Sequence, residues 1–383
     1  MTSADVVVVG GGVVGASAAY HLAAAGAGSV LLLERSDSLG TGSTGRCAGG
    51  FRHQFSSRIN VLLSIESIGM ITSFQETHGL PLDVDQDGYL FLVRDEDAWR
   101  GFLTGVELQR SLGVDARVLS ADEALEISPG IATDGVVGAT FCPDDGIADP
   151  SGLTLGYATA ARRAGAMIET GVEVTSVDIE GDRVVGVTTP NGRVSCGAVV
   201  NAAGPWAAEL ARTADVAMPV DPVPRHVMVT APFEEAPPRR TLVIDADTTF
   251  YFHREAGGVL MGMGRRDERP SFDTTPDERF IVDELLPTAV RVFPALERAG
   301  VSHRWVGLYE MTPDRHPIIG EAPGVSGFFL ANGFSGHGFQ HAPIVGKLLA
   351  EMIVEGKART VDVSGLGLER FGEDRLVHER RVV

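Results

Sequence analysis

The sequence predicts an α/β fold of two domains, one built on parallel strands and one containing a largely antiparallel sheet. Apolar strand-type segments that run into small-residue turns and helices occur near the start, the middle and the end of the chain. The stretches between them are rich in short β-type segments punctuated by proline and glycine. A chain of 383 residues is long enough for about two domains and a large core.

The first 35 residues contain the most informative motif. Residues 6–9 are four valines, which suits a strand buried on both faces. An Ala-rich segment typical of a helix follows over residues 16–25, and a second apolar run over residues 30–33 ends at Glu34. The glycines of the intervening turn have the spacing G-x-G-x-x-G: Gly10, Gly12 and Gly15. Together these features predict a Rossmann-like strand, turn, helix and strand.

A dinucleotide gives each part of this motif a physical role. The first glycine permits a tight turn, the second a close approach of the backbone to a pyrophosphate, and the third close packing of helix on strand. The helix N-terminus offers unpaired N–H groups to the phosphates. Glu34 can accept bonds from both ribose hydroxyls, which disfavours a 2′-phosphate. We therefore expect FAD or NAD rather than NADP, with a glycine-rich turn that binds nothing as the less favoured alternative.

The remaining elements are predicted from periodicity and turn signals. Residues 35–50 are too rich in Gly and Ser for helix or strand, and form either a flexible linker or a second phosphate contact. Asp149 and Pro150 are typical of a helix start, and Asn191-Gly192 of a hairpin. Helices are expected over residues 59–76, 96–112, 151–164, 276–293 and 342–356. Strands are expected over residues 88–93, 166–169, 172–179, 183–189, 193–196, 197–201 and 328–331, and near residues 220, 242, 251 and 259.

The order of these elements predicts discontinuous domains. Dinucleotide-type segments at the start, middle and end of the chain indicate one cofactor domain made of residues 1–85, 145–215 and 305–383. The β-rich insertions, residues 86–144 and 216–304, are expected to form a substrate domain.

Composition excludes several classes of partner. A formal net charge of −19 argues against nucleic acid or an anionic membrane surface. The apolar N-terminus carries Asp5 and no basic residue, so we interpret it as a strand rather than a signal peptide, and no apolar run reaches transmembrane length. Three cysteines, Cys47, Cys142 and Cys196, follow no disulfide or metal-site spacing. We expect no metal site and a reducing, cytoplasmic compartment.

Several motifs, in this order, resemble the D-amino-acid oxidase family of FAD enzymes, within it sarcosine oxidase and the β subunits of sarcosine oxidase and dye-linked L-proline dehydrogenase. Besides the N-terminal motif with Glu34-Arg35, the segments that carry the resemblance are Gly42–Arg46, Gly171–Val174, Asn201–Trp206, Thr312–Gly320 and Gly333–Phe339. The resemblance implies FAD as cofactor and oxidation of an amino acid or secondary amine to an imine, with a hydride passing to flavin N5. It leaves the electron acceptor unknown and a homo- or hetero-oligomer open.

The resemblance also assigns roles to residues. Arg52 matches the carboxylate-binding arginine of the family. Tyr251, on an expected strand of the substrate domain, is a candidate for a hydrogen bond to the same carboxylate. His53 and His337 are candidates for tuning the flavin or the protonation of the amine. A surface or packing role is the alternative for Arg52, Tyr251 and His53. The expected cofactor contacts are Gly10, Gly12, Val13, Val14, Gly15, Glu34, Arg35, Gly42, Ser43, Thr44, Arg46, Cys47, Ala48, Val174, Ala203, Gly204, Trp206, Gly336, His337, Gly338, Phe339 and Gln340.

Three positions depart from the pattern of sarcosine oxidase. Gly307 stands where the monomeric enzyme has a cysteine that holds FAD covalently, so we expect non-covalent FAD. Gly262 stands where those enzymes place a lysine for reaction with oxygen, and Gln340 replaces a carboxylate-binding lysine. A dehydrogenase is therefore favoured over a hydrogen-peroxide-forming oxidase, unless an arginine or a protonated His337 supplies the charge. An NAD-using dehydrogenase and a non-catalytic, flavin-carrying subunit of a complex remain as alternatives.

Overall fold

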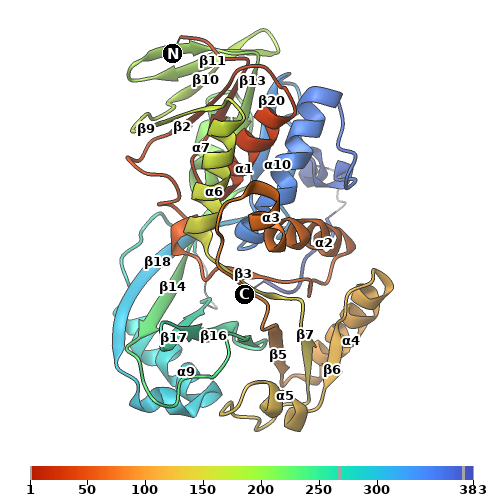
Figure 1. Ribbon diagram of the computed structural model, residues 1–383, viewed down its shortest axis with the longest axis vertical. Coiled ribbons are helices and arrows are strands. Elements are labelled where there is room, and N and C mark those ends of the chain that lie inside the picture. The colour runs from red at the N-terminus through yellow and green to blue at the C-terminus, as the bar shows by residue number, and fades with distance from the viewer. Residues whose placement is uncertain (1, 266, 268, 373–375, 383) are drawn as a thin grey trace.

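The structure, a computed structural model, describes residues 2–265, 267, 269–372 and 376–382. Figure 1 shows two halves, with a mostly parallel sheet and its helices above and a larger, mostly antiparallel sheet below. Among the described residues, no helix is both long enough and apolar enough to cross a membrane.

The upper half is organised around a six-stranded sheet of order β19-β20-β13-β1-β2-β9. All neighbouring strands run parallel except β19, which pairs antiparallel with β20 at the edge. The strands are β1 (Val6–Val9), β2 (Val30–Glu34), β9 (Met167–Thr170), β13 (Ala198–Asn201), β19 (Ile318–Glu321) and β20 (Phe328–Asn332). The parallel pairing predicted for the N-terminal motif is therefore confirmed.

Both faces of this sheet are buried, as the run of valines in β1 predicts. Val6 and Val8 contribute to one apolar core, and Val7 and Val9 to the other. On the first face, α1 packs against both α6 and α10, and a side chain on Gly346 of α10 would overlap the Ser17 hydroxyl of α1. The helices of this half are α1 (Val13–Ala24), α2 (Arg58–Thr72), α3 (Phe74–His78), α6 (Pro150–Arg163), α7 (Ala207–Arg212) and α10 (Gly338–Glu355).

The lower half contains an eight-stranded sheet of order β18-β14-β17-β16-β15-β5-β7-β6. Every pairing is antiparallel except that of β15 with β5. Its strands are β5 (Tyr89–Val93), β6 (Arg117–Leu119), β7 (Gly138–Cys142), β14 (Asp221–Thr230), β15 (Leu242–Asp245), β16 (Phe250–Glu255), β17 (Gly258–Met263) and β18 (Val301–Met311). Around it lie α4 (Glu96–Ser111), α5 (Ala121–Ile127), α8 (Glu278–Phe280) and α9 (Leu286–Val292), with a π-helical turn over Ile281–Leu285.

Two small antiparallel sheets complete the fold. They are β10-β11-β12, with strands β10 (Ser176–Glu180), β11 (Arg183–Thr189) and β12 (Gly192–Ser195), and β3-β8-β4, with strands β3 (Gly50–Phe51), β4 (Val84–Asp85) and β8 (Gly146–Ala148). Short 3₁₀ turns cover Thr44–Arg46, Gly204–Trp206, Pro294–Arg298, Ser364–Leu366 and Leu368–Gly372.

Several predicted boundaries differ from the structure. The last long helix begins at Gly338, four residues before the predicted start at residue 342. The strand predicted over residues 172–179 begins only at Ser176, because Val172 leaves the sheet after its N–H bonds to the carbonyl of Glu34. The helix predicted over residues 59–76 is divided at Ser73 into α2 and α3. The domain boundaries remain a prediction, and the one expected at residue 305 falls inside β18.

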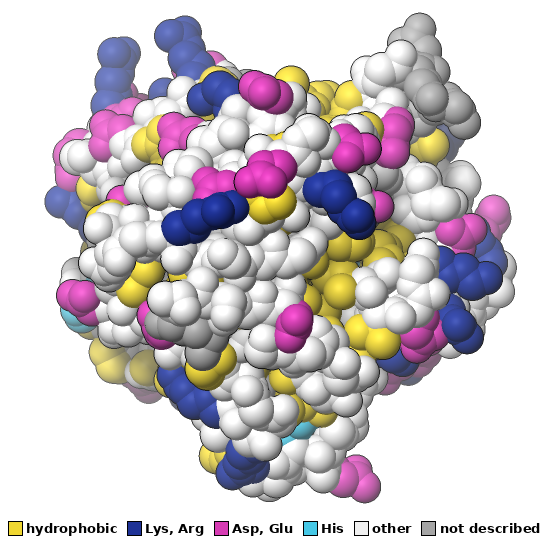
Figure 2. Space-filling model, turned by 90° about the horizontal axis from the view of Figure 1, so that it is seen from above, with side chains coloured by type: hydrophobic (Ala, Val, Ile, Leu, Met, Phe, Trp, Pro, Cys, Tyr) yellow, Lys and Arg dark blue, Asp and Glu magenta, His cyan; other side chains and the backbone are white. Residues whose placement is uncertain are grey.

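Charges on the upper face of the molecule are mixed. Figure 2, which views the molecule from above, shows acidic and basic side chains interspersed over this face, with apolar side chains in a hollow beside them. A nucleic-acid-binding face would instead gather basic residues.

Candidate active site

A cavity of about 780 Å³ extends from the carboxyl ends of β1 and β2 to the eight-stranded sheet. Open α/β sheets place their ligands at this end of the strands. The cavity brings together twenty-three of the predicted site residues. Two predicted residues, Gly15 and His53, do not line it. The lining set comprises Gly10, Gly12, Val13, Val14, Glu34, Arg35, Gly42, Ser43, Thr44, Arg46, Cys47, Ala48, Arg52, Val174, Ala203, Gly204, Trp206, Tyr251, Gly336, His337, Gly338, Phe339 and Gln340.

At the nucleotide end, the glycines leave room that a side chain would fill. Gly10 has φ +109°, and a Cβ there would overlap the carbonyl of Ala202. A Cβ on Gly15 would overlap the carbonyl of Gly10, so Gly15 acts by close packing of α1 on the turn and not by lining the cavity. Gly12 is the N-cap of α1. This cradle at a helix N-terminus fits the pyrophosphate of a dinucleotide.

Glu34 is held at the end of β2 by two main-chain donors. Its carboxylate accepts hydrogen bonds from Gly11 N at 2.6 Å and Ser36 N at 2.8 Å. The next residue, Arg35, places its guanidinium carbon 3.6 Å from the ring centroid of Trp206, and that indole stacks on Phe272 at 5.6 Å. Sequence reasoning missed Phe272, because it lies on a loop far from any cofactor motif.

The Gly/Ser-rich loop after β2 is bound to β18 rather than being a flexible linker. Ser43 Oγ donates to the carbonyl of Leu308 at 2.7 Å, and Arg46 Nη1 donates to the carbonyl of Val306 at 3.0 Å. The indole N–H of Trp305 donates in return to the carbonyl of Arg46 at 2.9 Å. The flexible-linker alternative is therefore wrong, and the loop forms a fixed wall in the middle of the cavity.

Cys47 and Gly307 face this middle section. Burial raises the pKa of the Cys47 thiol to about 11, so the side chain is a neutral thiol and not a nucleophile at pH 7. Gly307 lines the cavity in β18, where an added Cβ would lie 3.3 Å from Arg46 Cβ. A residue with a side chain would thus point into the loop that carries Cys47.

The turn after β13 is built by an asparagine. Asn201 Oδ1 accepts from Ala203 N at 3.1 Å and its Nδ2 donates to the carbonyl of Ala207 at 2.9 Å. These bonds, with φ +56° at Gly204, hold the 3₁₀ turn that carries Trp206 to the cavity wall. The predicted backing of the cofactor by Ala203 and Gly204 remains a prediction, and the geometry of the turn supports it.

At the other end of the cavity, Arg52 is only 4% exposed. Its Nη1 donates to the carbonyl of Gln54 at 2.5 Å, and its Nη2 to the carbonyl of Arg381. The guanidinium carbon lies 4.0 Å from the ring centroid of Phe55. Gln340 fixes the main chain of Arg52, accepting from its N–H at 3.1 Å and donating to its carbonyl at 3.0 Å. Two main-chain bonds use two of the five N–H groups that a guanidinium offers.

Three tyrosines, Tyr89, Tyr251 and Tyr309, line the same cavity as Arg52. Burial raises the pKa of Tyr89 and of Tyr251 above the ordinary range, so both phenols remain neutral hydrogen-bond donors. Tyr251 stands over Gly262, where a Cβ would overlap its hydroxyl. Tyr309 lies between Gly336, whose Cβ would be 2.5 Å from its ring, and the Arg225 guanidinium, 4.7 Å from its centroid.

Sequence reasoning missed several polar residues of this wall. They come from strands whose sequence carries no motif, and only their register in the eight-stranded sheet brings them to the cavity. These residues are Tyr89, Arg225, Tyr309 and Glu310.

Glu310 is a half-buried acid in the wall beside Tyr309. Burial raises the pKa of its carboxyl to about 7, although the N–H groups of Gly333 and Phe334 hydrogen-bond to it and act in the opposite direction. Its Oε2 is buried without a hydrogen-bond partner among the described residues. The group therefore changes protonation near neutral pH.

His337 is neutral rather than protonated. Burial lowers its pKa well below the ordinary value, and the charge of Arg52 acts in the same direction. Neither ring nitrogen has a hydrogen-bond partner in the described part of the chain, and the ring meets Phe55 edge-on at 4.7 Å. His337 therefore does not supply the positive charge that a protonated imidazole would bring to the cofactor.

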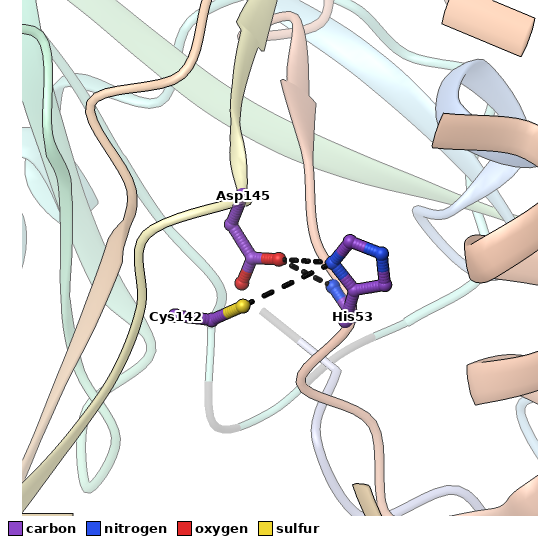
Figure 3. A group of neighbouring side chains, drawn as sticks. All are labelled: His53, Cys142 and Asp145. Carbon is purple, nitrogen blue, oxygen red and sulfur yellow. Dashed lines mark hydrogen bonds and ion pairs between the residues drawn. The ribbon is translucent and has the colours of Figure 1, made fainter. Parts of the chain in front are cut away.

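His53 does not line the cavity and lies in a cluster with Cys142 and Asp145 (Figure 3). Asp145 Oδ1 accepts from His53 N at 2.7 Å and contacts His53 Nδ1 at 2.8 Å, while Asp145 Oδ2 accepts from Gln54 Nε2 at 3.0 Å. The ligand atoms are close enough for a metal ion. Both carboxylate oxygens of Asp145 already accept hydrogen bonds from His53 or Gln54. The cluster therefore stabilises the loop that carries Arg52.

Comparisons with known proteins agree with this geometry. The profile of a family described as "FAD dependent oxidoreductase" (DAO) matches residues 5–352. A 4-methylaminobutanoate oxidase (formaldehyde-forming) of Paenarthrobacter nicotinovorans is 32% identical over 97% of this chain and 46% of its own length. Sarcosine dehydrogenase of Homo sapiens is 30% identical over 99% of this chain and 42% of its own length. The chain thus spans less than half of these two relatives.

Among solved structures, L-proline dehydrogenase from P. horikoshii superposes with a TM-score of 0.91. It is 33% identical, and the match covers 98% of this chain and 99% of the other. The likeness therefore extends over both large sheets.

Proposed function

Because the chain belongs to the DAO family of FAD-dependent oxidoreductases, we propose that it oxidises the C–N bond of a carboxylated secondary amine to an imine. The observation that carries the proposal is the cavity itself. One end has the glycine cradle and acid that suit FAD, and the other has the buried Arg52 among neutral tyrosines. The named substrates of the three relatives, 4-methylaminobutanoate, sarcosine and L-proline, are all secondary amines with a carboxylate.

The residues around the cavity have distinct roles in this reaction. Bound FAD would supply the acceptor for the hydride, which leaves a carbon bonded to the amine nitrogen. Arg52 binds the substrate carboxylate by charge-assisted hydrogen bonds, and Tyr251 donates a further one. Phe55 and the neutral ring of His337 keep water from the space beside Arg52. Orientation of the substrate, rather than covalent chemistry by the protein, is the main contribution.

The absorption spectrum of the purified protein tests this proposal. We expect a flavin spectrum, bleached without oxygen by an amine from a panel of amino acids and N-methyl amines. A protein with flavin that no amine bleaches would instead be the non-catalytic, flavin-carrying subunit. A protein without a flavin spectrum, even after incubation with FAD, would contradict both.

The FAD is proposed to be bound without a covalent link. Gly307 supports this, because it offers no side-chain atom at the wall where a cysteine would stand. Acid precipitation should leave yellow flavin in the supernatant, whereas flavin in the pellet would contradict non-covalent binding.

We further propose a dehydrogenase rather than an oxidase. A fixed positive charge at the flavin favours superoxide formation. Gly262 supplies none, and Tyr251 fills the space above it. Reduced enzyme should react slowly with oxygen and quickly with a quinone or dye in stopped-flow measurements. Reoxidation by oxygen as fast as turnover would show an oxidase, and Arg225, the cation over Tyr309, would then be the candidate for the positive charge.

A reducing, cytoplasmic compartment is also proposed, supported by the free thiols of Cys142 and Cys196.

A further inference from the structure

The last described residues, 376–382, form a segment that we call the C-terminal strap. Its Glu379 N–H bonds to the carbonyl of Asp314 at 3.0 Å, in the loop after β18. The strap thus reaches the region of Arg52 from the opposite end of the sequence.

Glu379 anchors the strap to the start of α2. It is 1% exposed, and its carboxylate accepts from Ser56 N at 2.9 Å, Ser57 N at 3.1 Å, both serine hydroxyls, and Asn60 Nδ2 at 3.1 Å. Burial acts to raise the pKa of Glu379, but the hydrogen bonds from Ser56 and from Arg381 N, together with the charge of Arg52, outweigh it and hold the pKa at about 2. A buried carboxylate with this many donors is costly to displace.

Arg381 anchors the strap to α4 on the other side. Its Nη2 donates to the carbonyl of Phe102 at 3.1 Å, and its guanidinium carbon lies 4.2 Å from the ring centroid of that residue. The guanidinium fits only because position 105 is glycine, since a Cβ on Gly105 would overlap it. Arg381 is 5% exposed, whereas its neighbour Arg380 is exposed.

Between these anchors, the main-chain carbonyl of Arg381 accepts a hydrogen bond from Nη2 of Arg52. The carbonyl of Gln54 accepts a second hydrogen bond, from Nη1 of Arg52. These two acceptors together fix the orientation of the guanidinium plane. An arginine side chain otherwise has much rotamer freedom to lose when it binds an anion. Fixing it beforehand lowers that loss.

We propose that the C-terminal strap is a positioning element for the substrate carboxylate, and that it acts through the Arg381 carbonyl on Arg52. The inference rests on the proposed function, because it gives Arg52 its anionic partner. It adds that residues 376–382, which belong to none of the cofactor motifs, contribute to specificity for a carboxylated substrate.

The test compares Glu379→Ala and Arg381→Ala with Arg380→Ala, an exposed neighbour in the same strap. The substrates are L-proline and L-prolinamide, or the acid and amide of whichever amine bleaches the wild-type flavin. For both strap variants, we expect KM for the acid to rise about tenfold, KM for the amide to change less than about twofold, and flavin content to stay at the wild-type level. Arg380→Ala should match wild type throughout.

A double-mutant cycle separates positioning from general stability. In an Arg52→Ala background, Arg381→Ala should cost nothing further for the acid, because the group it positions is gone. Arg381→Lys should recover part of the loss, since an ammonium can still reach the carbonyl of Phe102. Additive losses, equal losses on acid and amide, or loss of flavin would overturn the proposal and leave a structural role.

Failure of the proposed function gives a different result. In that case no acid bleaches wild-type flavin, and Arg52→Ala changes nothing. If wild type and Arg52→Ala behave as proposed while both strap variants match wild type, only the positioning role is wrong. If Glu379→Ala does not fold, Arg381→Ala and its cycle decide the question alone, because that change leaves the Glu379 anchor in place.

Discussion

The two ends of the cavity are built in different ways. At the nucleotide end, main-chain atoms and glycines from one strand–turn–helix unit shape the site, and Gly10 and Gly15 contact each other within five residues. At the substrate end, Arg52 is held by Gln340 and Arg381, which lie 288 and 329 residues away along the chain. The glycine cradle therefore depends on the absence of side chains, whereas the hold on Arg52 depends on contacts that only the complete fold assembles.

This difference predicts that the largest effect comes from adding a side chain at the nucleotide end. In Gly15→Val, the new Cβ would overlap the carbonyl of Gly10, and backbone on both sides of the contact resists movement. We expect loss of most bound flavin and a fall of about 3 kcal/mol in the free energy of unfolding. The flavin-to-protein absorbance ratio and denaturant unfolding measure both.

The matched control is Gly69→Ala in α2, where a Cβ would meet nothing within 4 Å. It should keep its flavin and gain roughly 0.5–1 kcal/mol from helix propensity. A Gly15→Val protein that retained wild-type flavin would show that close packing of α1 does not build the cofactor site.

A smaller and more selective effect is expected at Gly262. A methyl group in Gly262→Ala would overlap the Tyr251 hydroxyl and lie 2.9 Å from the carbonyl of His226. Because Tyr251 belongs to the substrate end, kcat/KM should fall about tenfold, or about 1.4 kcal/mol, while flavin content stays unchanged. Gly300→Ala, where the added Cβ meets open space, serves as control. Loss of flavin in Gly262→Ala would contradict the assignment of this position to the substrate end alone.

A third effect is confined to stability and depends on pH. Glu310 has a folded-state pKa of about 7, above the ordinary value of 4.5, because burial favours its neutral form. The folded state therefore binds more protons than the unfolded state between pH 4.5 and pH 7. Its contribution to stability is full below this window and is lost as the pH rises through it.

Replacement by Glu310→Gln keeps an acceptor for the N–H groups of Gly333 and Phe334 but removes this titration. The stability of the variant relative to wild type should rise by about 1–3 kcal/mol between pH 4.5 and pH 7.5. Thermal melts of the flavin-bound proteins across this range provide the measurement. A constant difference would show that Glu310 does not bury a neutral carboxyl.

The contrast between the two ends also explains what the sequence predicted. The glycine turn, β1, α1, β2 and Glu34 lie within 35 residues, and their order alone predicted parallel pairing and the cradle. The resemblance to a known family extended this to the discontinuous cofactor segments. The start of α10 was placed too late, because the glycines of the loop before it gave no helix signal.

The substrate end was predicted only through the family resemblance, and only in part. Arg52 and Tyr251 were assigned to it and both line the cavity, whereas His53 does not line it and contacts Asp145. Tyr309 and Glu310 reach the cavity through the pairing of β18 with β14, whose register no local pattern specifies. Burial then set the neutral state of His337, which a sequence cannot show.

The central claim is that one cavity joins FAD to a carboxylated amine held by Arg52. Anaerobic rapid mixing of wild type and Arg52→Ala with an amino acid and with its amide tests it most directly. Loss of a buried, charge-assisted pair should cost about 2–4 kcal/mol, so flavin reduction by the acid should slow roughly 30-fold to 1,000-fold in kcat/KM. Reduction by the amide should change much less. An equal loss for acid and amide would show that Arg52 is structural and would contradict the claim.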